Sequence, residues 1–239
     1  RTLGQQIHNI MDLGYDTFEL LNEPNLVHEG WGPTVEDAWQ FNCWACETIP
    51  LLRERYPGVK LLWPAMGYDL EGSDLWWWGR CKKSIRFCDG LAGHAYWQPA
   101  EEMFTLRWGR RYWYLRDIYP GMPLWITEAG NTDPNTSKAK KVWQYIGFCE
   151  MAELDGVKGV AFWLLEGSRV DPDWEAEQNC FFDEEMAEAL GRYIRERGIS
   201  SNPASSRACT KGFERRCQQA MGKKCRCACG GTNHGRRAL

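Results

Sequence analysis

The stretch Phe18-Glu19-Leu20-Leu21-Asn22-Glu23-Pro24-Asn25 joins an apolar run of strand length to a polar end that carries a glutamate. The stretch Leu124-Trp125-Ile126-Thr127-Glu128-Ala129-Gly130 repeats this arrangement further along the chain. Side chains at the C-terminal ends of parallel barrel strands point into the mouth where active sites lie. The two stretches therefore predict a pair of carboxylates, Glu23 and Glu128, held on rigid backbone at one end of a parallel sheet.

Around these stretches, apolar runs alternate with helical patterns. Strand-length runs occur at 17–21, 59–63, 90–96, 123–127 and 157–164. Continuous apolar strands joined by helices are typical of a parallel sheet that is buried on both faces. A doubly wound sheet and a (β/α)8 barrel both fit this alternation.

Three helices are predicted in detail, and residues 1–13 also read as a helix. Thr34, followed three residues later by Asp37, has the pattern of a helix N-cap. Pro50 is expected to kink or shorten the helix that follows. Further helices are predicted over 137–154 and 183–197.

Composition divides the chain into an acidic body and a basic tail. The chain has 239 residues, 44% of them hydrophobic, and a net charge of −3. Residues 200–239 contain nine Lys or Arg and one acid, which gives +8 and leaves −11 for the rest. We predict a barrel domain over 1–199, a linker over 200–208 and a Cys-rich basic tail over 209–239. No apolar run is long enough for a membrane span, so no membrane partner is expected.

Two glutamates at strand ends suit one reaction in particular. Hydrolysis of a glycosidic bond needs one carboxyl group to protonate the leaving oxygen and a second to attack the anomeric carbon or activate water. Asn22, next to Glu23, is placed to bind a sugar 2-hydroxyl, a contact that strengthens in the transition state. A salt-bridge or helix-capping role is the alternative for either glutamate considered alone.

Four motifs in order resemble a known clan. Asn22-Glu23-Pro24 and Ile126-Thr127-Glu128 resemble the strand-4 and strand-7 motifs of the (β/α)8 glycoside hydrolases that include cellulases, mannanases, β-xylosidases and β-galactosidases. Gly93-His94-Ala95-Tyr96-Trp97 and Ala161-Phe162-Trp163 are similar to the strand-6 and strand-8 motifs.

The resemblance implies a retaining O-glycoside hydrolase that acts on a β-linked oligo- or polysaccharide and needs no cofactor. Glu23 would be the acid/base and Glu128 the nucleophile. His94 would contact substrate, Tyr96 would orient Glu128, and Trp163 would form the floor of the sugar subsite. We also expect Trp97 to contact substrate.

The chain also departs from that clan. It has five predicted strands where the clan has eight, and nothing corresponds to strands 1–3 or to the arginine usual on strand 2. A full barrel takes about 250 residues. The fold is therefore expected to be an N-terminally incomplete TIM barrel, equivalent to strands 4–8 and inactive or poorly folded by itself. A non-catalytic carbohydrate-binding relic is the alternative.

The tail allows a different kind of site. Its thiols and imidazole suit Zn²⁺, and because a segment this small has no core of its own, bound metal is one way for it to fold. A disulfide cluster and a disordered tail are the alternatives, and a zinc-dependent interaction module is a third candidate function. One aromatic residue in the tail does not favour nucleic acid as a partner. The candidate ligands are Cys217, Cys225, Cys227, Cys229 and His234.

The chain is also rich in tryptophan, with 14 residues. Aromatic faces stack on sugar rings, so tryptophans in segments that follow strands are candidate subsites. Those that fall in helical patterns are expected to pack in the core. The first group contains Trp31, Trp76, Trp77, Trp78, Trp97 and Trp174; the second contains Trp39, Trp44 and Trp143.

Overall fold

The computed structural model describes residues 3–68, 72–162 and 184–196. The chain divides into two units, Arg1–Glu196 and Arg197–Leu239. The predicted linker and the tail, with Cys217, Cys225, Cys227, Cys229 and His234, lie outside the described residues. Trp163 and Trp174 lie outside them as well.

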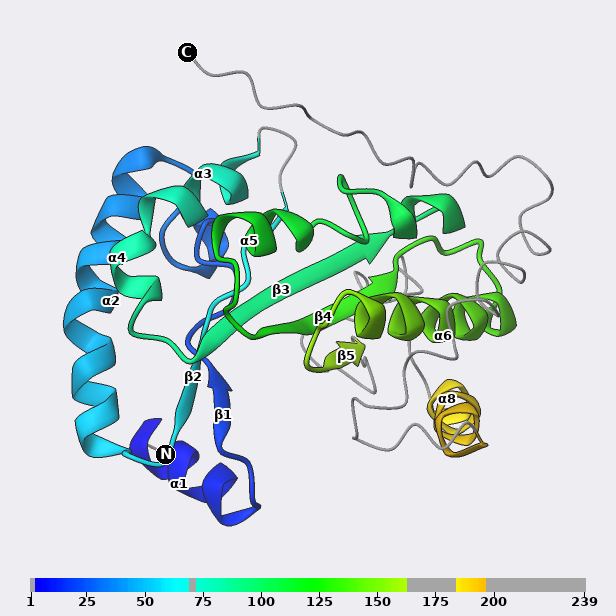
Figure 1. The fold of residues 1–239 in the computed structure, drawn as a ribbon, viewed down its shortest axis with the longest axis horizontal. Helices are drawn as coiled ribbons and strands as arrows, with labels where there is room; N and C mark the ends of the chain where they lie inside the picture. Colours follow the sequence, from blue (N-terminus) through cyan, green and yellow to red (C-terminus); the bar gives the residue numbers. More distant parts are fainter. Residues whose placement is uncertain (1–2, 69–71, 163–183, 197–239) are drawn as a thin grey trace, which may run out of the picture. The chain divides into compact units, whose positions relative to one another are not determined.

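The five strands form one parallel sheet in the order in which they occur along the chain, β1-β2-β3-β4-β5 (Figure 1). A doubly wound sheet reverses its strand order at a switch point, whereas a barrel adds each strand beside the last. The order therefore confirms the prediction of a partial barrel. The strands are β1 Thr17–Glu19, β2 Lys60–Trp63, β3 Gly90–Trp97, β4 Leu124–Asn131 and β5 Val160–Phe162.

Helices connect the strands. The α-helices are α1 Leu3–Asp12, α2 Val35–Arg55, α3 Ser73–Arg80, α4 Lys82–Ile85, α5 Trp113–Ile118, α6 Lys138–Leu154 and α8 Glu184–Glu196. Two short 3-10 helices, η1 Val27–Glu29 and η2 Ala100–Phe104, lie in loops. No helix in the described ranges combines the length and the apolar character needed to cross a bilayer.

Helix α2 begins as predicted but ends later. The Thr34 hydroxyl accepts a hydrogen bond from the Asp37 backbone N–H at 3.2 Å, and the Asp37 carboxylate accepts one from the Thr34 N–H at 3.0 Å. Of the two predicted effects of Pro50, the shortening is contradicted because α2 continues to Arg55, and the kink stays a prediction. Burial of Ala45 and Ile49, both 0% exposed, offsets the backbone hydrogen bond that a proline cannot make.

The core lies between the sheet and these helices and is rich in aromatic rings. Phe41 of α2 packs edge-on against Trp63 at 5.2 Å and at a tilt against Trp77 at 5.5 Å, between ring centroids. Two tryptophans expected in the core are instead exposed: Trp39 at 59% and Trp143 at 67%. Each lies on a helix whose other positions supply the buried stripe, so helical periodicity places these two rings outward.

Candidate active site

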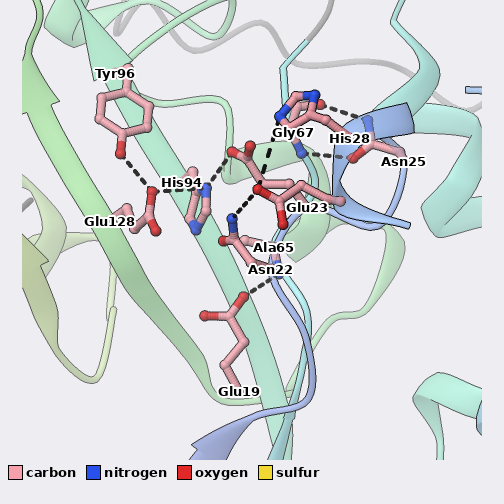
Figure 2. Close-up of polar contacts among 11 residues, drawn as sticks. Glu19, Asn22, Glu23, Asn25, His28, Ala65, Gly67, His94, Tyr96 and Glu128 are labelled. Carbon is pink, nitrogen blue, oxygen red and sulfur yellow. Dashed lines mark hydrogen bonds and ion pairs between the residues drawn. The ribbon is translucent and has the colours of Figure 1, made fainter. Parts of the chain in front are cut away.

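The predicted catalytic residues converge from three strands. Glu23 lies in the turn that follows β1, with a φ of +33° that non-glycine residues rarely adopt. His94 and Tyr96 lie on β3, and Glu128 lies within β4. Figure 2 shows His94 between the two glutamates, with Tyr96 on the far side of Glu128. Unusual backbone angles often cluster at functional sites, where the surrounding structure maintains them.

A bulge in the sheet brings Glu128 beside His94. Gly93 pairs with Ile126, but the next residue, His94, pairs with Glu128, so Thr127 is the extra residue. In regular pairing His94 would lie beside Thr127, and Glu128 would point to the opposite face of the sheet. Bulges next to active sites commonly redirect a side chain in this way. The motif order of the sequence carried no signal for the bulge.

The four side chains form a continuous chain of polar contacts. The Tyr96 hydroxyl donates to Glu128 Oε2 at 2.6 Å. His94 Nδ1 lies 2.6 Å from Glu23 Oε1 and 3.5 Å from Glu128 Oε2. The His94 side chain is only 4% exposed, and the two glutamate side chains are 17% exposed each. Imidazole and carboxylates therefore interact with little screening by water.

This environment changes the proton affinity of two of these groups. Burial acts to lower the pKa of His94, but the hydrogen bond to Glu23 and the charges of Glu128, Glu23 and Glu19 raise it overall. Burial raises the pKa of Glu128, although the charge of His94 and the hydrogen bond from Tyr96 oppose this shift. Protonated His94 and the Tyr96 hydroxyl thus both stabilise an ionised Glu128.

A third carboxylate, Glu19 at the end of β1, was not among the predicted site residues. Its Oε1 accepts a hydrogen bond from the Ala65 backbone N–H at 2.7 Å. Burial raises its pKa, while the charge of His94 lowers it. The sequence signal for Glu19 is that it is a charged residue within an otherwise apolar run of strand length.

Asn22 also lies at the site. Its side-chain amide donates to Glu29 Oε1 at 3.2 Å, and Figure 2 shows it beside Glu23. Glu29 belongs to the 3-10 helix that follows the turn carrying Glu23. Asn22 is therefore held by a contact within its own loop.

Trp97 lies in the core and not beside the carboxylates, which corrects the prediction of a substrate contact. Its side chain is 1% exposed, stacks on Phe148 at 5.1 Å, and donates its indole N–H to Gln144 at 2.7 Å. Successive residues of a strand point to opposite faces. Tyr96 faces the glutamates, so Trp97 faces the helix layer. Strand alternation read from the sequence was sufficient to reveal this.

Glu23, His94 and Glu128 also have the composition of a metal-binding cluster, since each offers one ligand atom within 4.8 Å of the others. A histidine that binds metal normally donates its second ring N–H to a protein group. His94 Nε2 is buried and has no such partner among the described residues. The cluster therefore suits the sharing of a proton between His94 and Glu23 better than the binding of a metal.

A narrow pocket opens beside Glu23. The strand residues His94 and Tyr96 line it together with Glu23, and residues from β3, from the loops that follow β2 and β3, and from α3 and α5 complete it. The remaining lining residues are Met66, Tyr68, Asp74, Trp78, Gly93, Arg107, Trp108, Arg111, Tyr112 and Leu115. Of the predicted tryptophan subsites, Trp78 contributes to this pocket, whereas Trp77 is fully buried and Trp31 packs against Phe41 at 4.9 Å.

Fold and site together define a parallel partial (β/α) barrel with two adjacent carboxylates, one in the turn after β1 and one in the C-terminal half of β4. No protein-family model matches the sequence, and no curated protein shows significant sequence similarity to it. Solved structures do match. The chain is similar to an exo-β-1,3-glucanase of glycoside hydrolase family GH128, subgroup VI, from Aureobasidium namibiae. The TM-score is 0.53 at 18% identity, over 78% of this chain and 72% of that one. This likeness supports the barrel fold.

Two further GH128 structures match less well. An endo-β-1,3-glucanase of subgroup II from Sorangium cellulosum gives a TM-score of 0.49 at 15% identity, over 71% of this chain and 66% of that one. An exo-β-1,3-glucanase of subgroup V from Cryptococcus neoformans gives 0.46 at 17% identity, over 72% and 65%. The chain thus spans about two thirds of the length of these two enzymes.

Proposed function

We propose that the protein is a retaining O-glycoside hydrolase that acts on a β-linked glycan. One observation carries the proposal: Glu23 and Glu128 approach each other across His94, with carboxylate oxygens within 4.8 Å. Retaining enzymes hold their two carboxyl groups about 5–5.5 Å apart, whereas inverting enzymes leave a wider gap for water. The short separation favours direct attack by one of the two glutamates.

Each carboxylate has a distinct role in this mechanism. Glu23 donates a proton to the glycosidic oxygen as Glu128 attacks the anomeric carbon, which breaks the bond to the leaving group and forms a glycosyl ester. Glu23 then removes a proton from a water molecule, which attacks the same carbon and releases Glu128. His94 at 2.6 Å from Glu23 assists the change of charge on that carboxylate.

The neighbouring side chains favour Glu128 as the nucleophile. The hydroxyl of Tyr96 donates to Glu128, and Glu23 has no such hydroxyl donor among the described contacts. A hydrogen bond to the charged form stabilises a carboxylate as an anion and fixes its orientation. In the proposed complex Asn22 binds the sugar 2-hydroxyl through its amide, since its contact with Glu29 uses one of the two N–H donors of that group.

The first substrates to test are β-1,3-glucans, because the similar structures are β-1,3-glucanases by name. Substrate preference depends on loops and subsites and does not follow from the fold. Laminarin and aryl β-glucosides should therefore be compared with other β-linked glycans.

A covalent trap tests the proposal even where turnover is slow. An activated 2-deoxy-2-fluoro-β-glycoside slows the second step, so the sugar should remain attached to Glu128 and be located there by peptide mass spectrometry. Glu128→Ala should abolish turnover and recover part of it with azide, giving an α-glycosyl azide. Glu23→Ala should retain activity on activated leaving groups and give a β-glycosyl azide. Sugar binding without any covalent label would support the carbohydrate-binding alternative instead.

A further inference from the structure

The pocket beside Glu23 contains two arginines in different electrostatic situations. Arg111 donates to the Asp74 carboxylate through two hydrogen bonds of 2.6 and 2.7 Å. Asp74 is only 1% exposed, so this ion pair is shielded from water. The charge of Arg111 is therefore compensated inside the protein.

Arg107 is different. Its Nε donates to the Tyr68 hydroxyl at 3.1 Å, and its guanidinium carbon lies 5.7 Å from the centre of the Trp108 ring. Within the described ranges no carboxylate lies at ion-pair distance from it. Arg107 is exposed. Its two terminal nitrogens thus remain available in the planar arrangement that matches a carboxylate.

Aromatic rings lie next to this guanidinium. The ring centroids of Tyr68 and Trp108 lie 4.6 Å apart, and the two ring planes are inclined at 56°. Both residues are half-buried. Tyr68 follows β2 and Trp108 follows β3, whereas Glu23 follows β1. All three residues therefore lie in loops at the same edge of the parallel sheet. Aromatic faces bind the C–H faces of sugars, and a guanidinium beside them selects for negative charge.

We propose that Tyr68, Arg107 and Trp108 form a subsite for a uronic acid unit of the glycan, on the leaving-group side of the cleaved bond. The assignment to that side rests on the proposed function: Glu23, the acid/base, lines the pocket, and Glu128 is not among its described lining residues. The carboxylate of the uronic acid pairs with Arg107, and its ring stacks on Trp108, because the guanidinium of Arg111 already lies over the Tyr68 ring at 4.6 Å.

Binding measurements test this subsite independently of catalysis. The full chain is titrated at neutral pH with methyl β-D-glucuronide and with methyl β-D-glucoside, which differ in having a carboxylate or a hydroxymethyl group at C6. The glucuronide should bind about tenfold more tightly, as expected for a charge-assisted hydrogen bond. This preference should fall as salt is added.

Two variants locate the effect. Arg107→Ala should bind both sugars equally, and Arg107→Lys should keep part of the preference because it retains the charge without the planar pair of donors. Arg116→Ala is the matched control: Arg116 is also exposed and lies 5.4 Å from the Trp113 ring, away from the pocket. This variant should bind like the parent. Circular dichroism verifies that each variant is folded.

Equal binding of the two sugars by the parent would overturn the proposal, and so would an equal loss of preference in Arg116→Ala. A preference that disappears only in Arg107→Ala supports the subsite even if no sugar is trapped on Glu128. Failure of the subsite and failure of the hydrolase mechanism are thus separate outcomes.

Discussion

The hydroxyl of Tyr96 is the one uncharged donor that the described contacts give to Glu128, at 2.6 Å. Tyr96→Phe removes this donor and leaves the ring in place. We expect kcat to fall about 10²-fold, the effect of losing one oriented donor at a reacting oxygen. Since the hydrogen bond lowers the pKa of Glu128, its loss should also move the acidic limb of kcat/KM to higher pH.

A pH–rate profile checks both parts of this prediction. Tyr15→Phe serves as the control, because Tyr15 is 65% exposed and lies outside the site. An unchanged acidic limb in Tyr96→Phe would show that the phenol does not control ionisation of Glu128.

Glu19 gives a second prediction at the residue scale. Burial raises its pKa above the ordinary value of 4.5, so the folded protein holds this proton more tightly than the unfolded chain does. The resulting stability is present below the unfolded pKa and is lost as the pH rises through the folded pKa. Glu19→Gln keeps an oxygen acceptor for the Ala65 N–H and removes the ionisation.

The melting temperature of Glu19→Gln relative to the parent should therefore rise between about pH 4 and about pH 8. Leu51→Gln, at a 65% exposed position of α2, changes no ionisable group and should show a constant difference over the same range. Parallel curves for Glu19→Gln and the parent would mean that Glu19 ionises in the folded protein as easily as in the unfolded chain.

The sequence predicted the positions of Glu23, Glu128, His94 and Tyr96 because strand ends and motif order are local features. It did not predict the contacts among them. Those contacts depend on the bulge at Thr127, which is a property of how β3 and β4 pair. Glu19 was missed because its importance comes from burial beside His94, which one strand does not reveal.

At the scale of elements, Asn25 joins the turn that carries Glu23 to the next loop. Its side chain is 0% exposed, accepts from the Gly67 N–H at 2.7 Å, and donates to the Gly67 carbonyl at 2.7 Å and to Ser73 Oγ at 3.0 Å. Asn25→Ala leaves the backbone groups of Gly67 buried without these partners. We expect a loss of about 2–3 kcal/mol in the free energy of unfolding.

Urea denaturation measures this loss, and kcat/KM should fall with it because Glu23 lies two residues away. Gln40→Ala, at an exposed position of α2, should change stability by no more than about 0.5 kcal/mol. A loss in Asn25→Ala no larger than in this control would contradict the role of Asn25 in joining the two loops.

The elements themselves were largely predictable. All five strands fall on the apolar runs of the sequence, since burial on both faces leaves a continuous pattern. The continuation of α2 past Pro50 and the exposure of Trp39 were not predicted, and for a common reason. The sequence shows the conformation and the burial that a residue type usually prefers. The conformation and the burial that it has in the protein depend on how α2 packs against the sheet.

At the scale of the whole molecule, β1 and β5 are the outer strands of the described sheet, and each pairs with one neighbouring strand. The likeness to a barrel enzyme makes this feature important, because a closed barrel has no edges. The low activity that the sequence led us to expect for residues 1–239 stays a prediction. The measurement compares the rate of substrate turnover with the fraction of protein molecules that the fluorosugar labels at Glu128.

The β1 edge allows a sharper prediction. Asp16 accepts a backbone hydrogen bond from Lys60, and Leu20 donates one to Leu62. Backbone groups alternate in direction along a strand, so those of Thr17 point away from β2, toward the open edge. Within residues 3–68, 72–162 and 184–196 no strand pairs with β1 on this side, and an unpaired strand edge is a template for association with another chain. We expect residues 1–239 to self-associate as their concentration rises.

Thr17→Pro should reduce this association and leave the fold intact, because proline removes an N–H that β2 does not use. Phe18→Pro is the matched control: it removes an N–H directed at β2 and should lower the melting temperature. Light scattering against concentration measures association, and thermal melts measure stability. If Thr17→Pro associates as strongly as the parent, contacts between chains form elsewhere. If the two variants have equal melting temperatures, the assigned direction of the β1 backbone groups is contradicted.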